Sequence, residues 1–291
     1  MHECKSSQST SPLAIAFLTN IFHWFSLMPF LSETTYQSTH GCVSCEGIRA
    51  QDDEDFHEFL GGPVAARLND SDAREELHSH LRGLSLTGMG QDALEEVLEA
   101  EVLEVREWAA GEALAEAFLE ERHEVVLPWN TERDKRNPFA SLPGADVVGF
   151  QRDGDSHRLA LGEVKCSSEA QWPPQVMSGR SGGLGHQLDA LANNLGTIHQ
   201  LLLWLLLRVK HTAHEVTFNQ ACTRYFNSNR RDIALFGILV RDQEAREQDL
   251  QARGSSLGGQ LQDPTRCSLI ALYLPWPISR LPEFIRQGDA A

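Results

Sequence analysis

The most constraining feature of the sequence is the stretch of residues 142–165, in which two short apolar segments flank a polar connection. The apolar segments are residues 147–150 (VVGF) and 159–161 (LAL). The dipeptide Asp153-Gly154 in the connection is a strong two-residue turn signal, because glycine adopts positive φ at no steric cost. The stretch therefore predicts a β-hairpin.

Charged residues stand at one end of this predicted hairpin. Asp146 begins the first strand, and Glu163 and Lys165 end the second. Side chains alternate between the faces of a strand, so Glu163 and Lys165 share a face while Val164 points into the opposite layer. Two carboxylates and one ammonium group are therefore expected to converge.

This set of groups suits one kind of chemistry. Carboxylate oxygens are ligands for hard divalent cations, and Mg²⁺ is usually held by one or two carboxylates together with water and substrate phosphate. A lysine beside such a cation can orient or deprotonate a water molecule. The spacing therefore predicts a metal-dependent phosphodiesterase site.

The same residues resemble the signature of the PD-(D/E)xK nuclease superfamily, in which an Asp begins one strand and (D/E)-x-K lies on the next. The matching segments are PGAD, which ends at Asp146, and EVK, residues 163–165. The resemblance covers mainly residues 108–190. It implies an α/β, restriction-endonuclease-like core with a central mixed sheet flanked by helices, and a Mg²⁺-dependent endonuclease or exonuclease activity on DNA.

The resemblance also assigns roles to the residues of the hairpin. Asp146, Glu163 and the backbone carbonyl of Val164 would bind Mg²⁺ or Mn²⁺. Lys165 would position the nucleophile or offset negative charge in the transition state.

A further acidic residue is expected on a helix predicted over residues 91–122. At about 100° per residue its buried stripe consists of Trp108, Gly111, Leu114, Ala115, Phe118 and Leu119. Glu112 falls at the margin of the stripe, while Glu116 and Glu120 rotate toward water. The first helix of the superfamily carries an acidic residue that points into the site, which implies a catalytic or metal-binding role for Glu112, with Glu116 in reserve. The alternative is an amphipathic helix whose Glu112 is simply solvated.

Two segments are candidates for contact with nucleic acid. Arg133, Lys135 and Arg136 make the loop before the hairpin the most basic in the chain, although a solvated loop remains the alternative. Gln187 opens a helix predicted over residues 186–210, and RecB-related nucleases of the superfamily place a glutamine on the helix after the (D/E)-x-K strand. An ordinary glutamine in a first helical turn is the alternative.

The distribution of charge divides the chain. The net charge is −16, whereas binding of phosphate favours basic surfaces. Residues 51–125 hold 21 acidic and 5 basic residues, which accounts for the whole net charge, and the remainder of the chain is neutral. We therefore predict an acidic helical lobe over residues 51–100 and a nuclease-like domain over residues 101–285.

The N-terminal 50 residues are expected to be poorly ordered or to serve as a docking segment. Residues 12–31 are apolar and long enough to span a bilayer, but polar residues interrupt them, and a docking helix is favoured over a signal or anchor. Cys42 and Cys45 form a lone C-x-x-C motif beside His40, which favours ordinary thiols over a zinc site. A cytoplasmic protein with reduced cysteines is predicted.

Four further elements complete the prediction. A helix is expected over residues 215–227, a buried strand over 233–240, a last strand over 268–274, and a charged surface excursion over 241–263.

The pairing of GADVVGF and LALGEVK with the later segment FGILVRD is similar to the nuclease subunits of Hachiman antiphage defence systems. That resemblance implies a partner helicase. The rival interpretations are a non-catalytic binding or scaffold subunit, a membrane-tethered adaptor organised by residues 12–31, and a metal-dependent hydrolase of small substrates.

Overall fold

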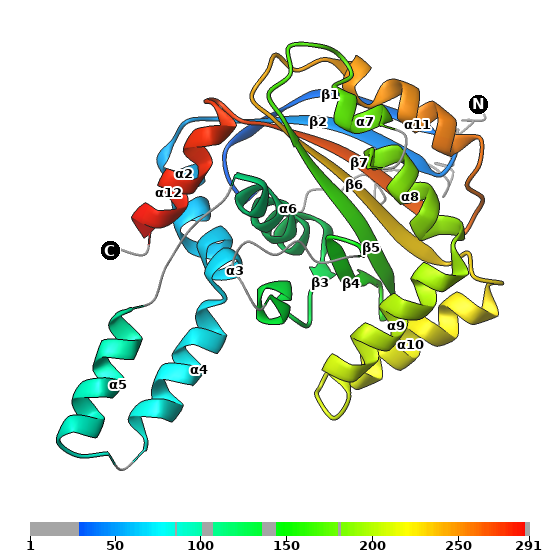
Figure 1. Ribbon diagram of the computed structural model, residues 1–291. Coiled ribbons are helices and arrows are strands. Elements are labelled where there is room, and N and C mark those ends of the chain that lie inside the picture. The colour runs from blue at the N-terminus through cyan, green and yellow to red at the C-terminus, as the bar shows by residue number, and fades with distance from the viewer. Residues whose placement is uncertain (1–28, 85, 101–106, 136–143, 180–181, 289–291) are drawn as a thin grey trace, which may run out of the picture.

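The chain folds around one seven-stranded mixed sheet. The computed structural model describes residues 29–84, 86–100, 107–135, 144–179 and 182–288. The strands are β1 Ser32–His40, β2 Val43–Ala50, β3 Val125–Val126, β4 Val147–Asp153, β5 Ser156–Ser167, β6 Ile233–Arg241 and β7 Arg266–Tyr273. Their spatial order is β1-β2-β7-β6-β5-β4-β3 (Figure 1). Neighbours from β2 to β5 run parallel, and the outer pairs are antiparallel. The predicted α/β class is confirmed.

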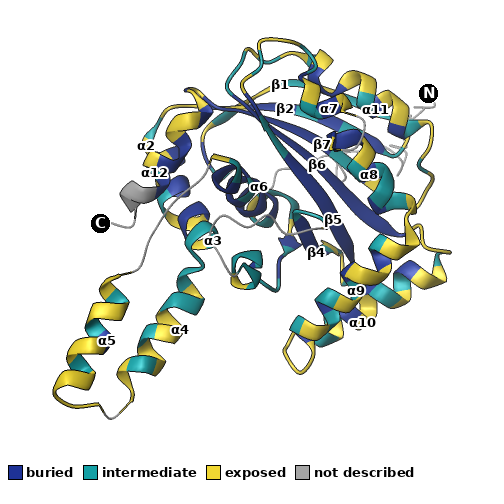
Figure 2. Ribbon diagram, in the orientation of Figure 1, coloured by how far each residue is buried: buried dark blue, intermediate teal, exposed yellow. Residues whose placement is uncertain are grey.

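Helices cover both faces of the sheet (Figure 1). The helices longer than one turn are α2 Glu54–Phe59, α3 Ala65–Asn69, α4 Ser71–Arg82, α5 Met89–Glu99, α6 Glu107–His123, α8 Leu184–Asn193, α9 Leu195–Val209, α10 Glu215–Asn227, α11 Gln251–Gly258 and α12 Leu281–Gly288. Helices α2, α3, α6 and α12 share one hydrophobic core with the sheet, and α8 to α11 share the other. Strands β5, β6 and β7 between these layers are mostly buried (Figure 2).

The predicted hairpin is confirmed. Strands β4 and β5 pair from Val147 opposite Gly162 to Asp153 opposite Ser156. Gly154, with φ of +63°, and Asp155 form the two-residue turn. Local turn chemistry therefore fixes the register that brings Asp146 beside the end of β5.

Helix α6 lies against β5 with almost no gap. A Cβ atom on Gly111 would fall 2.2 Å from Sγ of Cys166, the residue after Lys165. The helix is buried nearly all round rather than along one stripe, and its buried residues run from Ala109 to Gly111 and from Ala113 to Leu119. The prediction that Glu116 rotates toward water is therefore wrong, because both sides of this alanine-rich helix meet protein.

Two predicted helices differ from the structure in extent. The helix expected over residues 91–122 is represented by α5 and α6, because α5 ends at Glu99. The helix expected over residues 186–210 consists of α8 and α9, whose axes differ by 80°. Asn194 between them caps α9 by accepting hydrogen bonds from the backbone N–H groups of Gly196 and Thr197. Asparagine favours such caps over helix interiors, which explains the break.

Two segments predicted to lie outside the core belong to it. Residues 32–50, expected to be poorly ordered or a docking segment, form β1 and β2, and β2 pairs with β7 more than 200 residues later. The expected surface excursion over residues 241–263 contains α11, whose Leu257 is completely buried with Leu250 beside it. Residues 12–28 of the apolar stretch lie outside the described residues.

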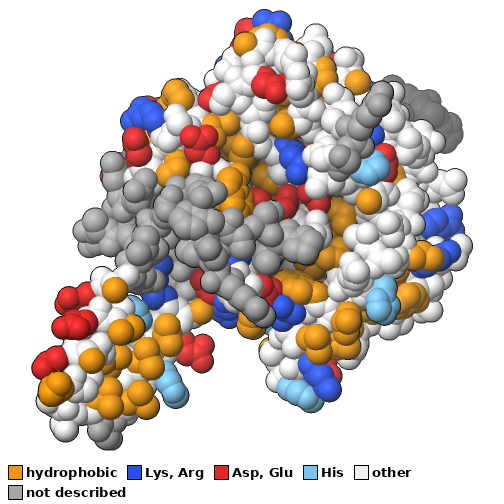
Figure 3. Space-filling model, viewed as in Figure 1, with side chains coloured by type: hydrophobic (Ala, Val, Ile, Leu, Met, Phe, Trp, Pro, Cys, Tyr) orange, Lys and Arg blue, Asp and Glu red, His pale blue; other side chains and the backbone are white. Residues whose placement is uncertain are grey.

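Helices α4 and α5 form an arm that projects from the body and is largely exposed (Figures 1 and 2). Apolar side chains gather on it in Figure 3. Its exposed large apolar residues are Leu77, Leu84, Leu86, Met89 and Val97. Within residues 51–100, predicted as one acidic helical lobe, α2 and α3 pack in the core beside the sheet, and α4 and α5 form the arm.

None of the described helices is by itself long and apolar enough to cross a membrane. Only the sharply bent pair of α8 and α9 reaches the required length and composition together.

Candidate active site

The candidate site forms where β4 begins and β5 extends beyond it, paired with β6. Strand β4 starts at Val147, opposite Gly162, so the next residues of β5 have no β4 partner. The Asp146 carboxylate takes the place of that partner: its Oδ2 accepts a hydrogen bond of 2.8 Å from the backbone N–H of Val164. The first acidic residue of the motif is thereby fixed against the strand that carries the other two charged residues.

Alternation along β5 distributes its side chains as the sequence predicts. Leu161 packs in the core under α8, and Val164 packs in the core under α6. By the same alternation, Glu163 and Lys165 face the α8 side. Lys165 Nζ lies 3.5 Å from Glu163 Oε2, and the exposed fraction of the Glu163 side chain is only 3%. Glu163 is therefore a buried carboxylate with the Lys165 ammonium group nearby.

The electrostatics of Glu163 show a lack of positive charge. Burial and then the negative charge of Asp146 raise its pKa, which Lys165 opposes, and the net result is a pKa of about 9. Two carboxylates this close cannot both ionise freely unless a proton or a cation lies between them.

Glu112 approaches Asp146 from α6. Burial raises the pKa of Glu112 to about 8, with Asp146 as the next cause and Lys135 lowering the pKa. Asp146 is thus the common neighbour of Glu112 and Glu163. Glu112 lies on α6 against one face of the sheet, whereas Glu163 and Lys165 face α8 on the other, so Asp146 is the group that the two sides share.

Glu116 belongs to this acidic group, one helical turn after Glu112. It is buried, which raises its pKa to about 8, and its counter-charge is Arg67, whose Nε lies 4.0 Å away. Arg67 also forms an ion pair with Glu120. Arg67 was not predicted as part of the site. It lies on α3, and no local sequence pattern links it to α6.

Acidic side chains gather in the middle of the face shown in Figure 3, beside apolar side chains. Carboxylate oxygens are suitable ligands for a hard divalent cation. The raised pKa values of Glu112 and Glu163 show that a nearby positive charge would stabilise their ionised forms. In the described part of the chain, however, no three Asp, Glu, His or Cys side chains are close enough together to hold a metal ion. The donor chemistry of these carboxylates fits Mg²⁺.

Helix α8 borders the site on the other face. Gly237 pairs with Glu163 in the parallel ladder, and a Cβ atom there would fall 2.8 Å from Leu188 of α8. The helix is therefore pressed onto the sheet at the level of Glu163. Gln187 precedes Leu188 and is half-buried, and its Oε1 is buried without a hydrogen-bond partner among the described residues.

The basic loop is already neutralised by acidic residues. Arg133 donates two hydrogen bonds, of 2.8 and 3.0 Å, to the Asp70 carboxylate. Lys135 pairs with Glu132 and lies 4.7 Å from the ring centroid of Trp108. These cations are therefore held by protein carboxylates rather than presented freely to phosphate. Arg136 lies outside the described residues.

No protein-family model matches the sequence, and no curated protein matches it either.

Proposed function

We propose that the chain is a metal-dependent nuclease that hydrolyses phosphodiester bonds in DNA. The observation that supports this proposal is that Asp146, fixed against β5 at Val164, neighbours Glu112 of α6 on one side and Glu163, beside Lys165, on the other. The resemblance of PGAD and EVK to the PD-(D/E)xK signature agrees with this arrangement.

In the proposed mechanism the protein supplies oxygen ligands and one positioned cation. Asp146, Glu163 and the carbonyl of Val164 would hold Mg²⁺ or Mn²⁺, and Glu112 would turn toward Asp146 to complete the set or to orient water. A bound divalent cation polarises the scissile phosphate and lowers the pKa of a coordinated water. Lys165 orients the attacking water and offsets the negative charge that develops on the phosphate oxygens. The bond to the leaving oxygen breaks as the bond from water oxygen to phosphorus forms.

We propose that DNA is delivered by a protein partner. The chain is strongly acidic, and Arg133, Lys135 and Arg208 are all paired with carboxylates. Cations that are held by carboxylates in this way add little affinity for phosphate. A helicase in a cytoplasmic antiphage defence system, as the Hachiman resemblance implies, would present the strand to the site.

A second candidate function is a non-catalytic binding or scaffold subunit. The incomplete metal geometry among the described residues favours it. The buried carboxylates argue against it, because a site without chemistry gains nothing from keeping Glu163 and Glu112 at a cost in stability.

The test is cleavage by the purified chain, alone and with a co-expressed helicase partner. Supercoiled DNA, linear duplex, single-stranded DNA and RNA are each incubated with Mg²⁺, Mn²⁺ or chelator. We expect cleavage of DNA that needs a divalent cation and is lost in Glu163→Gln. The matched control is Glu99→Gln, at an exposed position at the end of α5.

If none of these substrates is cleaved when partner and cation are present, the non-catalytic binding subunit becomes the favoured function. Metal-dependent hydrolysis of small phosphodiesters to a phosphomonoester and an alcohol, with every nucleic acid intact, would instead identify a hydrolase of small substrates.

A further inference from the structure

Arg241 and Asp249 form an ion pair that is completely shielded from solvent. Arg241 ends β6, and Asp249 ends the short 3-10 helix Glu247–Asp249. The distance from Arg241 Nη1 to Asp249 Oδ1 is 2.9 Å, and neither side chain has any exposed surface. Removing two charges from water often costs more free energy than their attraction returns, so a buried ion pair is weak support for stability alone. What Arg241 contacts besides Asp249 is therefore informative.

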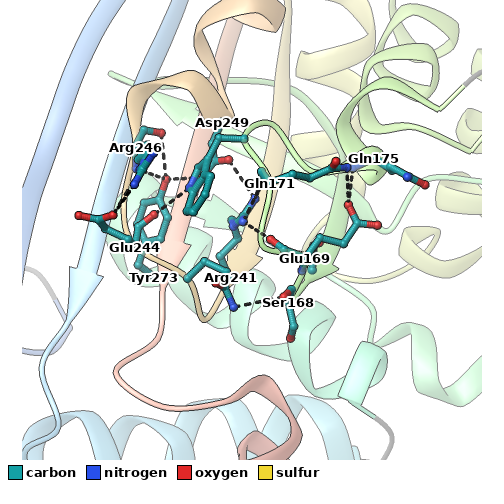
Figure 4. A network of polar contacts seen from close by, with 12 residues as sticks. Ser168, Glu169, Gln171, Gln175, Arg241, Glu244, Arg246, Asp249 and Tyr273 are labelled. Carbon is teal, nitrogen blue, oxygen red and sulfur yellow. Dashed lines mark hydrogen bonds and ion pairs between the residues drawn. The ribbon is translucent and has the colours of Figure 1, made fainter.

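Arg241 holds the loop that follows β5 (Figure 4). Its Nη2 donates a hydrogen bond of 2.6 Å to the carbonyl of Glu169, and both Nη atoms lie 3.2 Å from the carbonyl of Gln171. These carbonyls belong to residues 168–174, which begin three residues after Lys165. The planar guanidinium thus holds the start of this loop, here called the β5–α7 loop, against the C-terminal end of β6.

The connection between β6 and β7 fixes the same loop from a second side. Tyr273 donates a hydrogen bond of 2.7 Å from its hydroxyl to Asp249 Oδ2. Arg246 lies 4.0 Å from the ring centroid of Trp172, whose Nε1 donates to the carbonyl of Glu244 at 3.0 Å. The loop is therefore held both through its backbone and through the Trp172 side chain.

The β5–α7 loop joins two sides of the candidate site. Before it stand Glu163 and Lys165 on β5. After it comes α7, Gln175–Ser178, whose first backbone N–H donates to the Glu169 side chain at 2.6 Å. Helix α8, with Gln187, follows α7. A shift of the loop would move the end of β5 and the start of α8 relative to each other.

We propose that Arg241 is a positioning residue for the candidate active site: by binding the carbonyls of Glu169 and Gln171 it holds β5 and α8 in the geometry that hydrolysis needs. This inference rests on the proposed function, because it assigns Arg241 to the site that contains Lys165. Arg241 itself contacts neither substrate nor cation.

The test compares variants that remove the hydrogen bonds from Arg241 to the β5–α7 loop without leaving an unpaired buried charge. In Arg241→Met with Asp249→Asn, both charges are removed, and the amide still accepts from Tyr273. The single variant Arg241→Lys keeps the charge but lacks the fork of donors that reaches two carbonyls. The matched control removes a surface ion pair, Arg49 with Glu33, through Arg49→Met and Glu33→Gln.

Two readouts are measured on the full chain: amide hydrogen exchange, and cleavage of DNA with Mg²⁺. We expect exchange within residues 168–178 to rise at least about 10-fold in the double variant, while the amides of β6 keep their protection. We expect kcat to fall by about 100-fold, as for a misplacement of about 1 Å, while KM for DNA changes less than about 3-fold. Arg241→Lys should show the same pattern to a smaller degree.

A double variant with wild-type kcat would overturn the proposal, and so would unchanged exchange in residues 168–178. If the double variant does not fold, Arg241→Lys decides by the same two criteria. If the wild-type protein cleaves no nucleic acid, the proposed function is wrong. Faster exchange confined to residues 168–178 in the double variant would still show that Arg241 holds the β5–α7 loop.

Discussion

At the scale of single residues, the candidate site is defined by carboxyl groups that the fold buries without enough positive charge. Glu163 and Glu112 each have a raised pKa, and burial is the largest cause in both. An acidic group whose folded pKa lies above its unfolded pKa destabilises the protein increasingly as pH rises from the lower value to the higher. For Glu163 that window runs from about pH 4.5 to about 9.

We therefore predict that Glu163→Gln stabilises the chain in chelator-containing buffer. The gain should grow between pH 5.5 and 8.5 and reach at least about 1 kcal/mol, the equivalent of roughly one pKa unit. Urea unfolding at the two pH values measures it, with the exposed Glu99→Gln as control. A gain that shrinks with rising pH would contradict the predicted burial of the charged form.

The neighbours of the candidate residues could be predicted from the sequence only in part. Asp146, Glu163 and Lys165 follow from one local hairpin, and Glu112 from helical periodicity together with the family resemblance. The sequence places Glu116 toward water because the periodicity of a helix does not reveal which other elements pack against it. Its burial arises from α3, whose Arg67 lies about 50 positions earlier in the chain.

At the scale of elements, the site depends on close contact between α6 and β5. Gly111 is required there because any Cβ atom would overlap Cys166 Sγ. We predict that Gly111→Ala destabilises the chain by about 1–3 kcal/mol, as overpacking of a core does. Because the next Cys166 atom is at 3.9 Å, Cys166→Ala should recover most of that loss when combined with it.

A double-mutant cycle in urea measures this coupling between α6 and β5. Simple additivity of Gly111→Ala and Cys166→Ala would show that helix and strand do not meet at this contact.

The far end of the hairpin is held by an ion-pair network. Burial of Asp153 would raise its pKa, but hydrogen bonds from Arg224 and Arg158 lower the pKa to about 2. A depressed folded pKa contributes stability above the unfolded value, and that contribution is lost as pH falls through the folded value. We predict that Asp153→Asn costs about 1–2 kcal/mol at pH 6 and progressively less between pH 4 and 2.

Unfolding by urea at pH 6, 4 and 3 measures this contribution. An equal cost at pH 6 and pH 3 would mean that the Asp153 charge does not stabilise the hairpin.

Prediction at this scale succeeded where the signals were local. The hairpin carries the turn signal Asp153-Gly154, β6 is a continuous apolar run up to its last residue, and β7 ends in one. By contrast, the sequence of β1 is almost wholly polar, and β2 is defined by pairing with β7. The break at Asn194 is a local cap signal, but the apolar block that follows it predicts one continuous helix.

At the scale of the whole molecule, the acidic character of the chain limits what it can bind alone. Among the described residues, the cations Arg67, Arg133, Lys135 and Arg208 are each paired with a carboxylate. We predict weak binding of duplex DNA by the isolated chain, with a slope of log affinity against log salt smaller than about 3 in magnitude.

Fluorescence anisotropy between 50 and 200 mM salt checks this slope. A slope of about 6 or steeper would show an extended phosphate-binding surface and remove the need for a partner to deliver DNA.

The measurement that tests the central claim most directly is divalent-cation-dependent DNA cleavage by wild type, Lys165→Ala and Lys210→Ala. Lys210 is exposed at the end of α9 and serves as the matched control. The account predicts cleavage with Mg²⁺ or Mn²⁺ by wild type and Lys210→Ala, and a loss of at least about 100-fold in Lys165→Ala. Cleavage that survives in Lys165→Ala would contradict the assignment of the site to the end of β5.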